Sequence, residues 1–542
     1  MRRKLYLETF GCQMNVLDSE LVLGQLRAHG YESVEERDDA DVIIYNTCSV
    51  REHAEQKVWS RLGELRQRKK SDPGLVIGVI GCMAERDGEN IFQRHPHVDV
   101  LCGPGELDKL ATLVHNAVVT GAEGHKRTRQ IALMGASVRR SSTLEAAEDH
   151  LELLDLSRSI SPEDNLAQAY VRITRGCNKF CTYCVVPYTR GPEVHRPPQN
   201  IIDEVKRLAD AGVREVTLLG QTINHYNFRH GDGRETTFAE LLYAIHEAVP
   251  HLPRLRFVTS FPRDFTDEAL AAMRDCERIC RYLHVPAQSG SDRLLKLMNR
   301  GYTARQYLDF IDRAKTMMPD ICIASDFIVG FPTETDEDFA TTVEMVKKCR
   351  FKNSFIFKYS PRPGTVAIDR FKDDVSEDVK RRRNNELLAV QQEVCAENNR
   401  QMIGKTVQVL VEGESKLASK PAYPSAPGGV ELGWERRRGG AALEATAARV
   451  QLIGRTGGDQ IVAFDGERSL KGQILDIEIV AAKNLTLFGQ PICASAAPAC
   501  GTAAPAVCLE LPPGGGTHVA QPPSAVSLIP PAAEHSRGGC AT

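Results

Sequence analysis

The stretch AYVRITRGCNKFCTYC, residues 169–184, decides how the centre of the chain folds. Its first part, Ala169 to Thr174, has the pattern of a buried strand. The loop that follows places Cys177, Cys181 and Cys184 at C-x3-C-x2-C spacing and offers no fourth cysteine. A metal site that only holds a fold together is four-coordinate and closed, whereas an open position belongs to a site that acts on a bound molecule. The stretch therefore predicts a strand that leads into a reactive metal site.

Two kinds of metal centre fit this loop. Thiolates hold iron-sulfur clusters, and three cysteines would leave one iron of a 4Fe-4S cluster open. Phe180 and Tyr183 lie between the cysteines and would shield whatever is bound. The alternative is a structural zinc site completed by a distant residue, for which His195 is the nearest candidate downstream. The missing fourth ligand and the position after a strand favour the cluster.

A series of strand and helix patterns continues from this strand. The further predicted strands are Glu215–Gly220, Arg254–Ser260, Arg281–Pro286, Cys322–Gly330 and Phe355–Ser360. Together with the first strand they give six β/α units, which predict a partial (β/α)6 barrel over residues 166–398. The chemistry of such a barrel lies in the loops after its strands. The three-cysteine stretch is the first of these loops.

The first 130 residues also alternate strands and helices, and they predict a doubly wound parallel sheet. Three predicted strands each end within a residue or two of a cysteine: Lys4–Phe10 before Cys12, Asp41–Asn46 before Cys48, and Leu75–Gly81 before Cys82. Ligands of such sheets bind just beyond the carboxyl ends of the strands. Each cysteine taken singly is also explained as a small buried hydrophobe. Their shared position favours a second set of metal ligands.

The remaining segments differ in composition from these two domains. Residues 131–165 predict a linker, and residues 399–489 predict a small all-β barrel with an insertion at 416–449. Residues 490–542 are rich in Ala, Pro and Gly and predict a disordered tail. Within the insertion, Arg436, Arg437 and Arg438 are interpreted as a solvated run, with phosphate contacts as the alternative.

The composition is that of an ordinary globular protein of a reducing compartment. The chain has 542 residues, of which 42% are hydrophobic and 26% charged. The opening MRRKLYLETF turns polar too soon for a signal peptide, and no run reaches transmembrane length, so we expect a cytoplasmic protein without a membrane. Sixteen cysteines in such a compartment favour metal binding over disulfides. The net charge of -3 does not indicate which class of molecule the protein binds.

The three-cysteine loop resembles the signature of the radical S-adenosylmethionine (SAM) enzymes, in which SAM chelates the open iron. Further motifs resemble, in order, those of the methylthiotransferase family: LETFGCQMNVLDSE, YNTCSVREHAEQK, VIGCMAER, RGCNKFCTYCVVPYTRG, SDFIVGFPTET and KYSPRPGT. GRTGGDQIVAFDG and NLTLFG resemble the C-terminal TRAM module of that family. The resemblance covers about residues 1–489, and GCQMN with NTCSVRE resembles its tRNA-modifying MiaB type.

This resemblance implies two 4Fe-4S clusters, one on each set of three cysteines, and SAM as a further cofactor. It implies methylthiolation of N6-(dimethylallyl)adenosine next to the anticodon of tRNA, giving the 2-methylthio derivative at the expense of two SAM. For SAM we expect contacts from the backbone near Tyr183 and from Gly220 and Gln221, although the LLGQ stretch is equally explained as a turn. The implied partners are the tRNA anticodon stem-loop and an electron donor such as flavodoxin or ferredoxin, and we expect a monomer.

Two alternatives change the substrate or the class of protein. One keeps the chemistry and acts on threonylcarbamoyl-adenosine in tRNA or on a ribosomal protein side chain; Gln13 and Met14 after the first cysteine argue against both. The other is a zinc-bearing RNA-binding protein without catalysis. The chain departs from the family at Thr222, where Asn is usual, and at Phe261, where His is usual. We expect neither residue to touch a cluster ligand.

Overall fold

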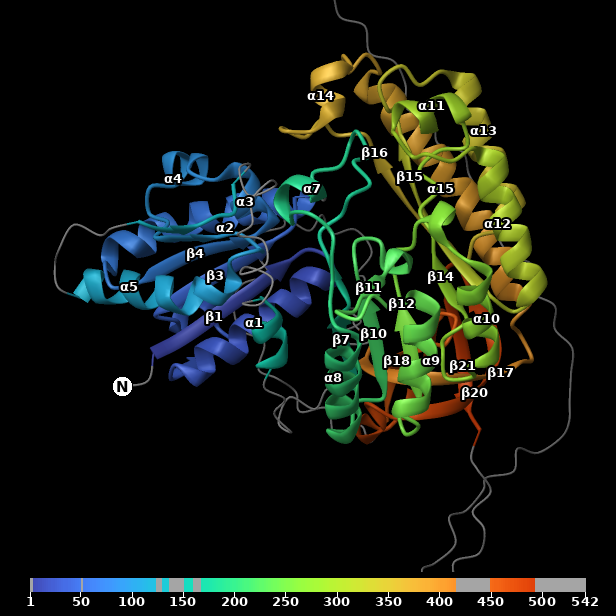
Figure 1. The fold of residues 1–542 in the computed structure, drawn as a ribbon, viewed down its shortest axis with the longest axis horizontal. Helices are drawn as coiled ribbons and strands as arrows, with labels where there is room; N and C mark the ends of the chain where they lie inside the picture. The colour runs from blue at the N-terminus through green and yellow to red at the C-terminus, as the bar shows by residue number, and fades with distance from the viewer. Residues whose placement is uncertain are drawn as a thin grey trace, which may run out of the picture. The chain divides into compact units, whose positions relative to one another are not determined.

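The computed structural model describes residues 3–49, 52–122, 129–135, 151–158, 167–415 and 449–492 (Figure 1). The predicted insertion, except for Arg449, and the predicted tail from residue 493 lie outside the described residues, as does most of the predicted linker. Within the described ranges, no helix combines the length and the apolar character needed to cross a membrane.

The N-terminal region is a parallel sheet in the order β2-β1-β3-β4-β5-β6, which confirms the predicted doubly wound sheet. Its strands are β1 (Arg3–Phe10), β2 (Tyr31–Ser33), β3 (Val42–Thr47), β4 (Val76–Gly81), β5 (Val100–Cys102) and β6 (Gln130–Ala132). Its helices are α1 (Gln13–Ala28), α2 (Glu52–Ser71), α3 (Cys82–Asp87), α4 (Asn90–Arg94) and α5 (Leu110–Ala122).

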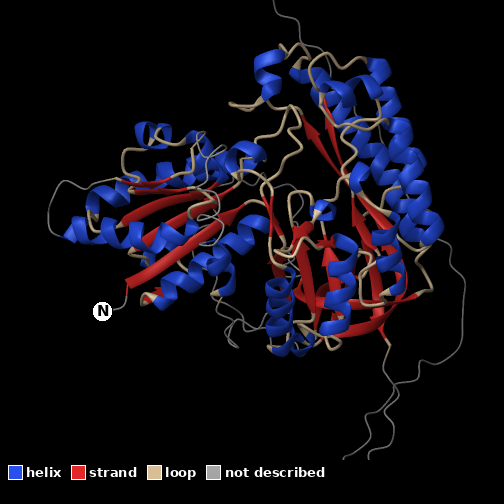
Figure 2. Cartoon of the chain, viewed as in Figure 1, coloured by secondary structure: helices blue, strands red, loops and turns tan. Residues whose placement is uncertain are grey.

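Helices cover both faces of this sheet (Figure 2). Helices α1 and α5 pack on one face through Leu17, Leu21 and Val114, and α2 packs on the other through Val58 and Leu62. Strands β3 and β4 are buried at every residue, because a central strand covered on both sides has no solvent face.

The segment expected to be a linker contains ordered structure. Strand β6, of which residues 131 and 132 fall in this segment, pairs in parallel with β5 as the last strand of the N-terminal sheet, and residues 151–156 are helical. A strand of three residues shows too little periodicity to be recognised among the surrounding Ser, Glu and Arg.

Six parallel strands form the predicted partial barrel: β7 (Gln168–Arg172), β10 (Glu215–Leu219), β13 (Arg254–Phe257), β14 (Tyr282–His284), β15 (Cys322–Val329) and β16 (Asn353–Lys358). They pair in the orders β13-β10-β7 and β14-β15-β16. A parallel bridge between Leu255 and Ile279 joins the two halves. The accompanying helices are α8 (Pro198–Asp210), α9 (Phe238–Ala248), α10 (Asp267–Asp275), α12 (Ala304–Met317), α13 (Asp336–Cys349) and α15 (Glu377–Arg400).

Shorter elements lie in the loops of the partial barrel. They are β8 (Thr174–Arg175), α7 (Val186–Thr189), β9 (Val194–His195), η5 (Ile223–His225), β11 (Asn227–Arg229), β12 (Glu235–Thr237), α11 (Asp292–Leu297) and α14 (Val366–Arg370). Strands β8 and β9 pair antiparallel, Thr174 with His195 and Arg175 with Val194. This pair closes the base of the loop that carries Cys177, Cys181 and Cys184.

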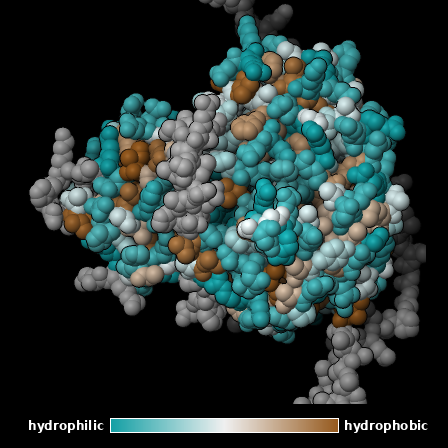
Figure 3. All heavy atoms as spheres, in the orientation of Figure 1, coloured by the Kyte–Doolittle hydropathy of each residue, from teal (hydrophilic) through white to brown (hydrophobic). Residues whose placement is uncertain are grey.

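The C-terminal part is a closed barrel in the order β17-β18-β19-β21-β20, as predicted for a small all-β module. Its strands are β17 (Thr406–Glu414), β18 (Val450–Thr456), β19 (Ile461–Gly466), β20 (Ile474–Lys483) and β21 (Thr486–Pro491). Val409, Leu452, Phe464 and Ile477 fill its interior. The face of the molecule in Figure 3 is mostly hydrophilic, with apolar residues in small separate groups.

Candidate active site with two cysteine triads

The three N-terminal cysteines follow three adjacent parallel strands. Register pairs Phe10 of β1 with Thr47 of β3, and Thr47 with Gly81 of β4, so the three strands end level with one another. Cys12 caps the N-terminus of α1, Cys48 directly follows β3, and Cys82 begins α3. The predicted position of this N-terminal triad at one sheet edge is confirmed.

The sulfur atoms of the N-terminal triad interact with one another. A hydrogen bond between the side chains of Cys48 and Cys12 and the positive charge of Arg190, against the effect of burial, lower the pKa of Cys12 to about 5. Burial raises the pKa of Cys82, although Arg190 opposes this shift and Cys12 reinforces it. The site thus holds one thiolate and one buried thiol beside a common cation.

Arg190 reaches the N-terminal triad from the loop that also carries the second triad. Its guanidinium donates to Oδ2 of Asp18 at 2.7 Å, and Arg172 donates to Oδ1 of the same carboxylate at 2.9 Å. The side chain of Asp18, on α1, is 1% exposed. Sequence reasoning missed both Arg190 and Asp18, although each lies inside a quoted motif, VVPYTRG and GCQMNVLDSE.

The second triad lies on a tight loop after β7 and β8, as predicted. Cys177 and Cys181 are buried, and Cys184 is partly exposed. Gly176 opens the loop at φ 68°, where a Cβ atom would lie 1.9 Å from the carbonyl oxygen of Pro192, so only glycine fits. Burial, reinforced by Cys181, raises the pKa of Cys184 to about 12. Burial also raises the pKa of Cys177. Without a bound cation these two sulfurs are therefore protonated.

Two residues outside the loop contact sulfurs of the second triad. Nη1 of Arg300 lies 3.4 Å from Sγ of Cys181, and Oγ1 of Thr222 lies 3.5 Å from Sγ of Cys177. The expectation that Thr222 touches no candidate ligand is therefore wrong. The η5 turn that follows β10 brings Thr222 against the cysteine loop, which spacing in the sequence does not reveal. The guanidinium of Arg300 lies 4.5 Å from the ring centroid of Phe261. Phe261 therefore contacts the arginine that contacts Cys181.

The residues expected to bind SAM surround the second triad. The hydroxyl of Tyr183 lies 3.4 Å from Nη1 of Arg300. Gly220 directly follows β10, at a position where a Cβ atom would lie 2.2 Å from Oγ1 of Thr174. Oε1 of Gln221 is buried and has no hydrogen-bond partner among the described residues. A buried acceptor without a donor is costly in a native protein, so Gln221 is suited to receive an N–H or O–H group of a ligand.

The sulfur atoms of neither triad are gathered as the three ligands of one ion would be. Within the described part of the chain, neither set brings its three sulfur atoms within 4.8 Å of one another. Ligand sulfurs around a tetrahedral zinc ion lie about 3.8 Å apart, given Zn–S bonds of about 2.3 Å. Cysteine thiolates are the ligands that hold iron-sulfur clusters, so the donor atoms of each triad fit the 4Fe-4S group that the motif implies.

A cavity of about 800 Å³ lies along the inner side of the partial barrel. Gln13, directly after Cys12, contributes to its wall, as do Phe355 and Phe357 of β16. As whole residues, Phe355 and Phe357 are 46% and 39% exposed. Charged side chains from the C-terminal barrel, including Arg455 and Asp459, line the same cavity. It can therefore hold a large polar molecule with an aromatic part.

Two family models match the chain over the regions that carry the triads. Residues 4–103 match the uncharacterized protein family UPF0004, and residues 171–346 match the radical SAM superfamily. Cys12, Cys48 and Cys82 lie in the first region, and Cys177, Cys181 and Cys184 in the second. The fold and the cysteine loop thus define a radical SAM enzyme.

Whole-length relatives narrow this class. The chain is 46% identical over 490 residues to a tRNA-2-methylthio-N(6)-dimethylallyladenosine synthase of Rhodopirellula baltica, covering 90% of this chain and 96% of the relative. It is 41% identical to a protein of the same name from Porphyromonas gingivalis, with 90% and 95% covered, and 39% identical to one from Neisseria gonorrhoeae, with 90% and 99% covered. The chain belongs to this family of radical SAM methylthiotransferases.

Proposed function

We propose that the chain converts N6-(dimethylallyl)adenosine next to the anticodon of tRNA to its 2-methylthio derivative, using two SAM. The observation that carries this proposal is the identity of 46% over 90% of the chain with a relative named for that reaction. The presence of both cysteine triads, each next to a buried arginine, supports it.

The proposal assigns one 4Fe-4S cluster to each triad. Cys12, Cys48 and Cys82 would hold the auxiliary cluster in a domain spanning residues 1–130, and the other triad would hold the SAM-binding cluster in residues 166–398. A reduced 4Fe-4S cluster with SAM bound supplies the one-electron chemistry that breaks a C–H bond on an aromatic ring.

The residues of the chain have separate tasks in this scheme. Arg190 and Arg300 place a positive charge beside the sulfur ligands and so favour their thiolate form. Oε1 of Gln221 accepts a hydrogen bond from SAM. Gly220 has no side chain, so its backbone can contact SAM directly. The backbone at Tyr183, within the cysteine loop, holds the polar end of the cofactor.

The cavity along the partial barrel supports a nucleoside substrate. Phe355 and Phe357 present exposed rings on which a purine can stack, a contact worth about 1–3 kcal/mol per base. In the proposal the C-terminal barrel, residues 399–489, is TRAM-like. It binds the anticodon stem-loop by contacting the shape and the sugar-phosphate backbone of the RNA. The remaining partner is an electron donor such as flavodoxin or ferredoxin, and the enzyme works as a cytoplasmic monomer.

The test is modification of tRNA by the reconstituted chain. Purified protein, SAM and a reductant are incubated anaerobically with tRNA that carries either the dimethylallyl or the threonylcarbamoyl form of adenosine. Digested nucleosides are then measured by mass spectrometry. The proposal expects the 2-methylthio product from dimethylallyl tRNA only, and none with Cys177→Ala. Product from the threonylcarbamoyl tRNA alone would reject the substrate while keeping the chemistry.

A further inference from the structure

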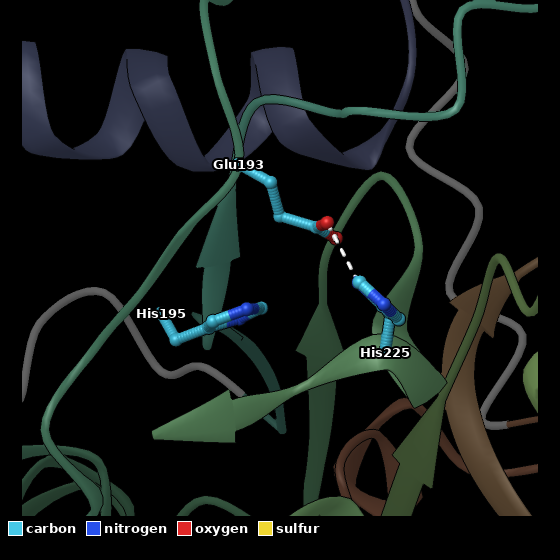
Figure 4. A group of neighbouring side chains, drawn as sticks. All are labelled: Glu193, His195 and His225. Atoms are coloured by element: carbon cyan, nitrogen blue, oxygen red, sulfur yellow. Dashed lines mark hydrogen bonds and ion pairs between the residues drawn. The ribbon is translucent and has the colours of Figure 1, made fainter. Parts of the chain in front are cut away.

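Three side chains outside the cysteine triads converge next to the cysteine loop. They are Glu193 and His195, at the strand β9 that closes the loop, and His225, at the end of η5 (Figure 4). One ligand atom of each lies within 4.8 Å of the other two. In the described part of the chain, this is the one group of three or more His, Cys, Asp and Glu residues with such spacing.

Two atoms of this group are buried and have no partner among the described residues. They are Oε1 of Glu193 and Nδ1 of His195. The Glu193 side chain is only 2% exposed, and its other oxygen, Oε2, accepts from Nδ1 of His225 at 2.7 Å. Buried polar atoms in native proteins are almost always paired, so two such atoms in one place indicate a missing partner.

The identity of these atoms limits what the partner can be. A carboxylate oxygen is only an acceptor, and an imidazole nitrogen without its proton is also an acceptor. A single bound cation would satisfy both atoms at once, and two imidazoles with one carboxylate form the ligand set of a three-ligand zinc site. Lys179 and Asp264 also act electrostatically on His225, but they form an ion pair with each other. The carboxylate of Glu193 is therefore the group that would balance the charge of a bound cation.

We propose that Glu193, His195 and His225 form a site for one divalent transition-metal ion, with zinc as the preferred ion and one coordination position left to water. This site is separate from both cysteine triads, and it does not depend on the proposed reaction. His195 therefore belongs to a metal site of its own and does not complete the cysteine set.

The position of the site gives it a structural consequence. His195 pairs with Thr174 across the short β8–β9 ladder, and His225 lies three residues after Thr222, which contacts Cys177. A bound ion would join the base of the cysteine loop to the turn after β10, which carries Gly220 and Gln221. A ladder of two residue pairs is weak by itself, so the ion would fix the spacing of the two loops.

The test measures zinc binding to the full-length chain after both clusters have been assembled anaerobically. The protein is incubated with Zn²⁺, freed of excess ion by gel filtration, and assayed for zinc and iron. We expect about one zinc per chain, and X-ray absorption at the zinc edge should give only N and O neighbours at about 2.0–2.1 Å. Zinc–sulfur scattering at about 2.3 Å would place the ion on cysteines and overturn the proposal.

Variants make the assignment specific to these residues. His195→Ala and His225→Ala should each weaken zinc binding at least about tenfold, with iron content unchanged. His251→Ala is the matched control, because His251 pairs with Asp210 at 2.9 Å but belongs to no three-ligand group in the described residues. Equal zinc retention in all three variants, or no zinc in the wild type at micromolar concentration, would overturn the proposal. The absorption spectrum of the wild type decides the question even if a variant fails to fold.

Discussion

The charge on Cys12 in the metal-free chain is a direct test of how the N-terminal triad is built. Its pKa of about 5 makes this side chain about 99% thiolate at pH 7. Cys322 is also partly exposed, but burial raises its pKa to about 11, which leaves a thiolate fraction of about 10⁻⁴. The two side chains thus differ about 10⁴-fold in the reactive form.

Nucleophilicity reduces this difference, because a thiolate of lower pKa is intrinsically less reactive. With a Brønsted coefficient of about 0.45, six pKa units cost Cys12 about 500-fold, so its labelling should remain about twentyfold faster than that of Cys322. The assay is pulse alkylation of the cluster-free chain with iodoacetamide at a series of pH values, with peptides quantified by mass spectrometry. Cys12 labelling should fall only as the pH drops through about 5.

Two variants separate the causes of this shift. The hydrogen bond from Cys48 is its largest cause, so Cys48→Ala should raise the labelling midpoint of Cys12 most. Arg190→Gln should raise it by less, since it removes only the positive charge. A midpoint for the wild type near the ordinary value of about 8.5 would refute the proposed contact between the strand ends.

Three further predictions concern the second triad and its supports. Gly176→Ala should remove about half of the bound iron, because its Cβ atom would overlap the carbonyl of Pro192, 1.9 Å away; full iron content would contradict the loop geometry. Cys177→Ala should abolish reductive SAM cleavage, measured as 5'-deoxyadenosine; unchanged cleavage would reject the radical SAM assignment. Burial opposes ionisation of Asp155, yet Arg172, Arg175 and Arg196 hold its pKa below the usual range, so its contribution to stability is present above about pH 3.9 and lost as pH falls further. Asp155→Asn should therefore cost about 3–5 kcal/mol of unfolding free energy at pH 7, seen in the urea midpoint. A difference that does not shrink as the pH falls below about 3.9 would contradict this origin.

The cysteine positions could be predicted from sequence because strand ends are recognisable. Buried runs such as VIIYNT and VIGVIG mark central parallel strands, and the next residue or two must lie at the sheet edge. The barrel loop was predictable for the same reason. Short elements were not, and Gln130–Ala132 shows why: three residues carry no period.

The contacts between sites could not be predicted from spacing. Arg190 meets Asp18 across 172 positions, and Arg300 meets Cys181 across 119. The first pair depends on how the N-terminal domain packs on the partial barrel, and the second on how two loops of the barrel meet. A single sequence encodes neither contact in any local pattern. The contact between His225 and Glu193 was not predictable either, because no sequence pattern links them and only the η5 turn brings them together.

Iron and sulfide per chain, after anaerobic reconstitution, test the central claim most directly. The wild type should bind about eight irons and eight sulfides, and the Cys177, Cys181, Cys184→Ala triple variant about four of each, because each triad holds its own 4Fe-4S cluster. A wild type that stops at about four irons, or that loses all of its iron in the triple variant, would contradict two independent clusters.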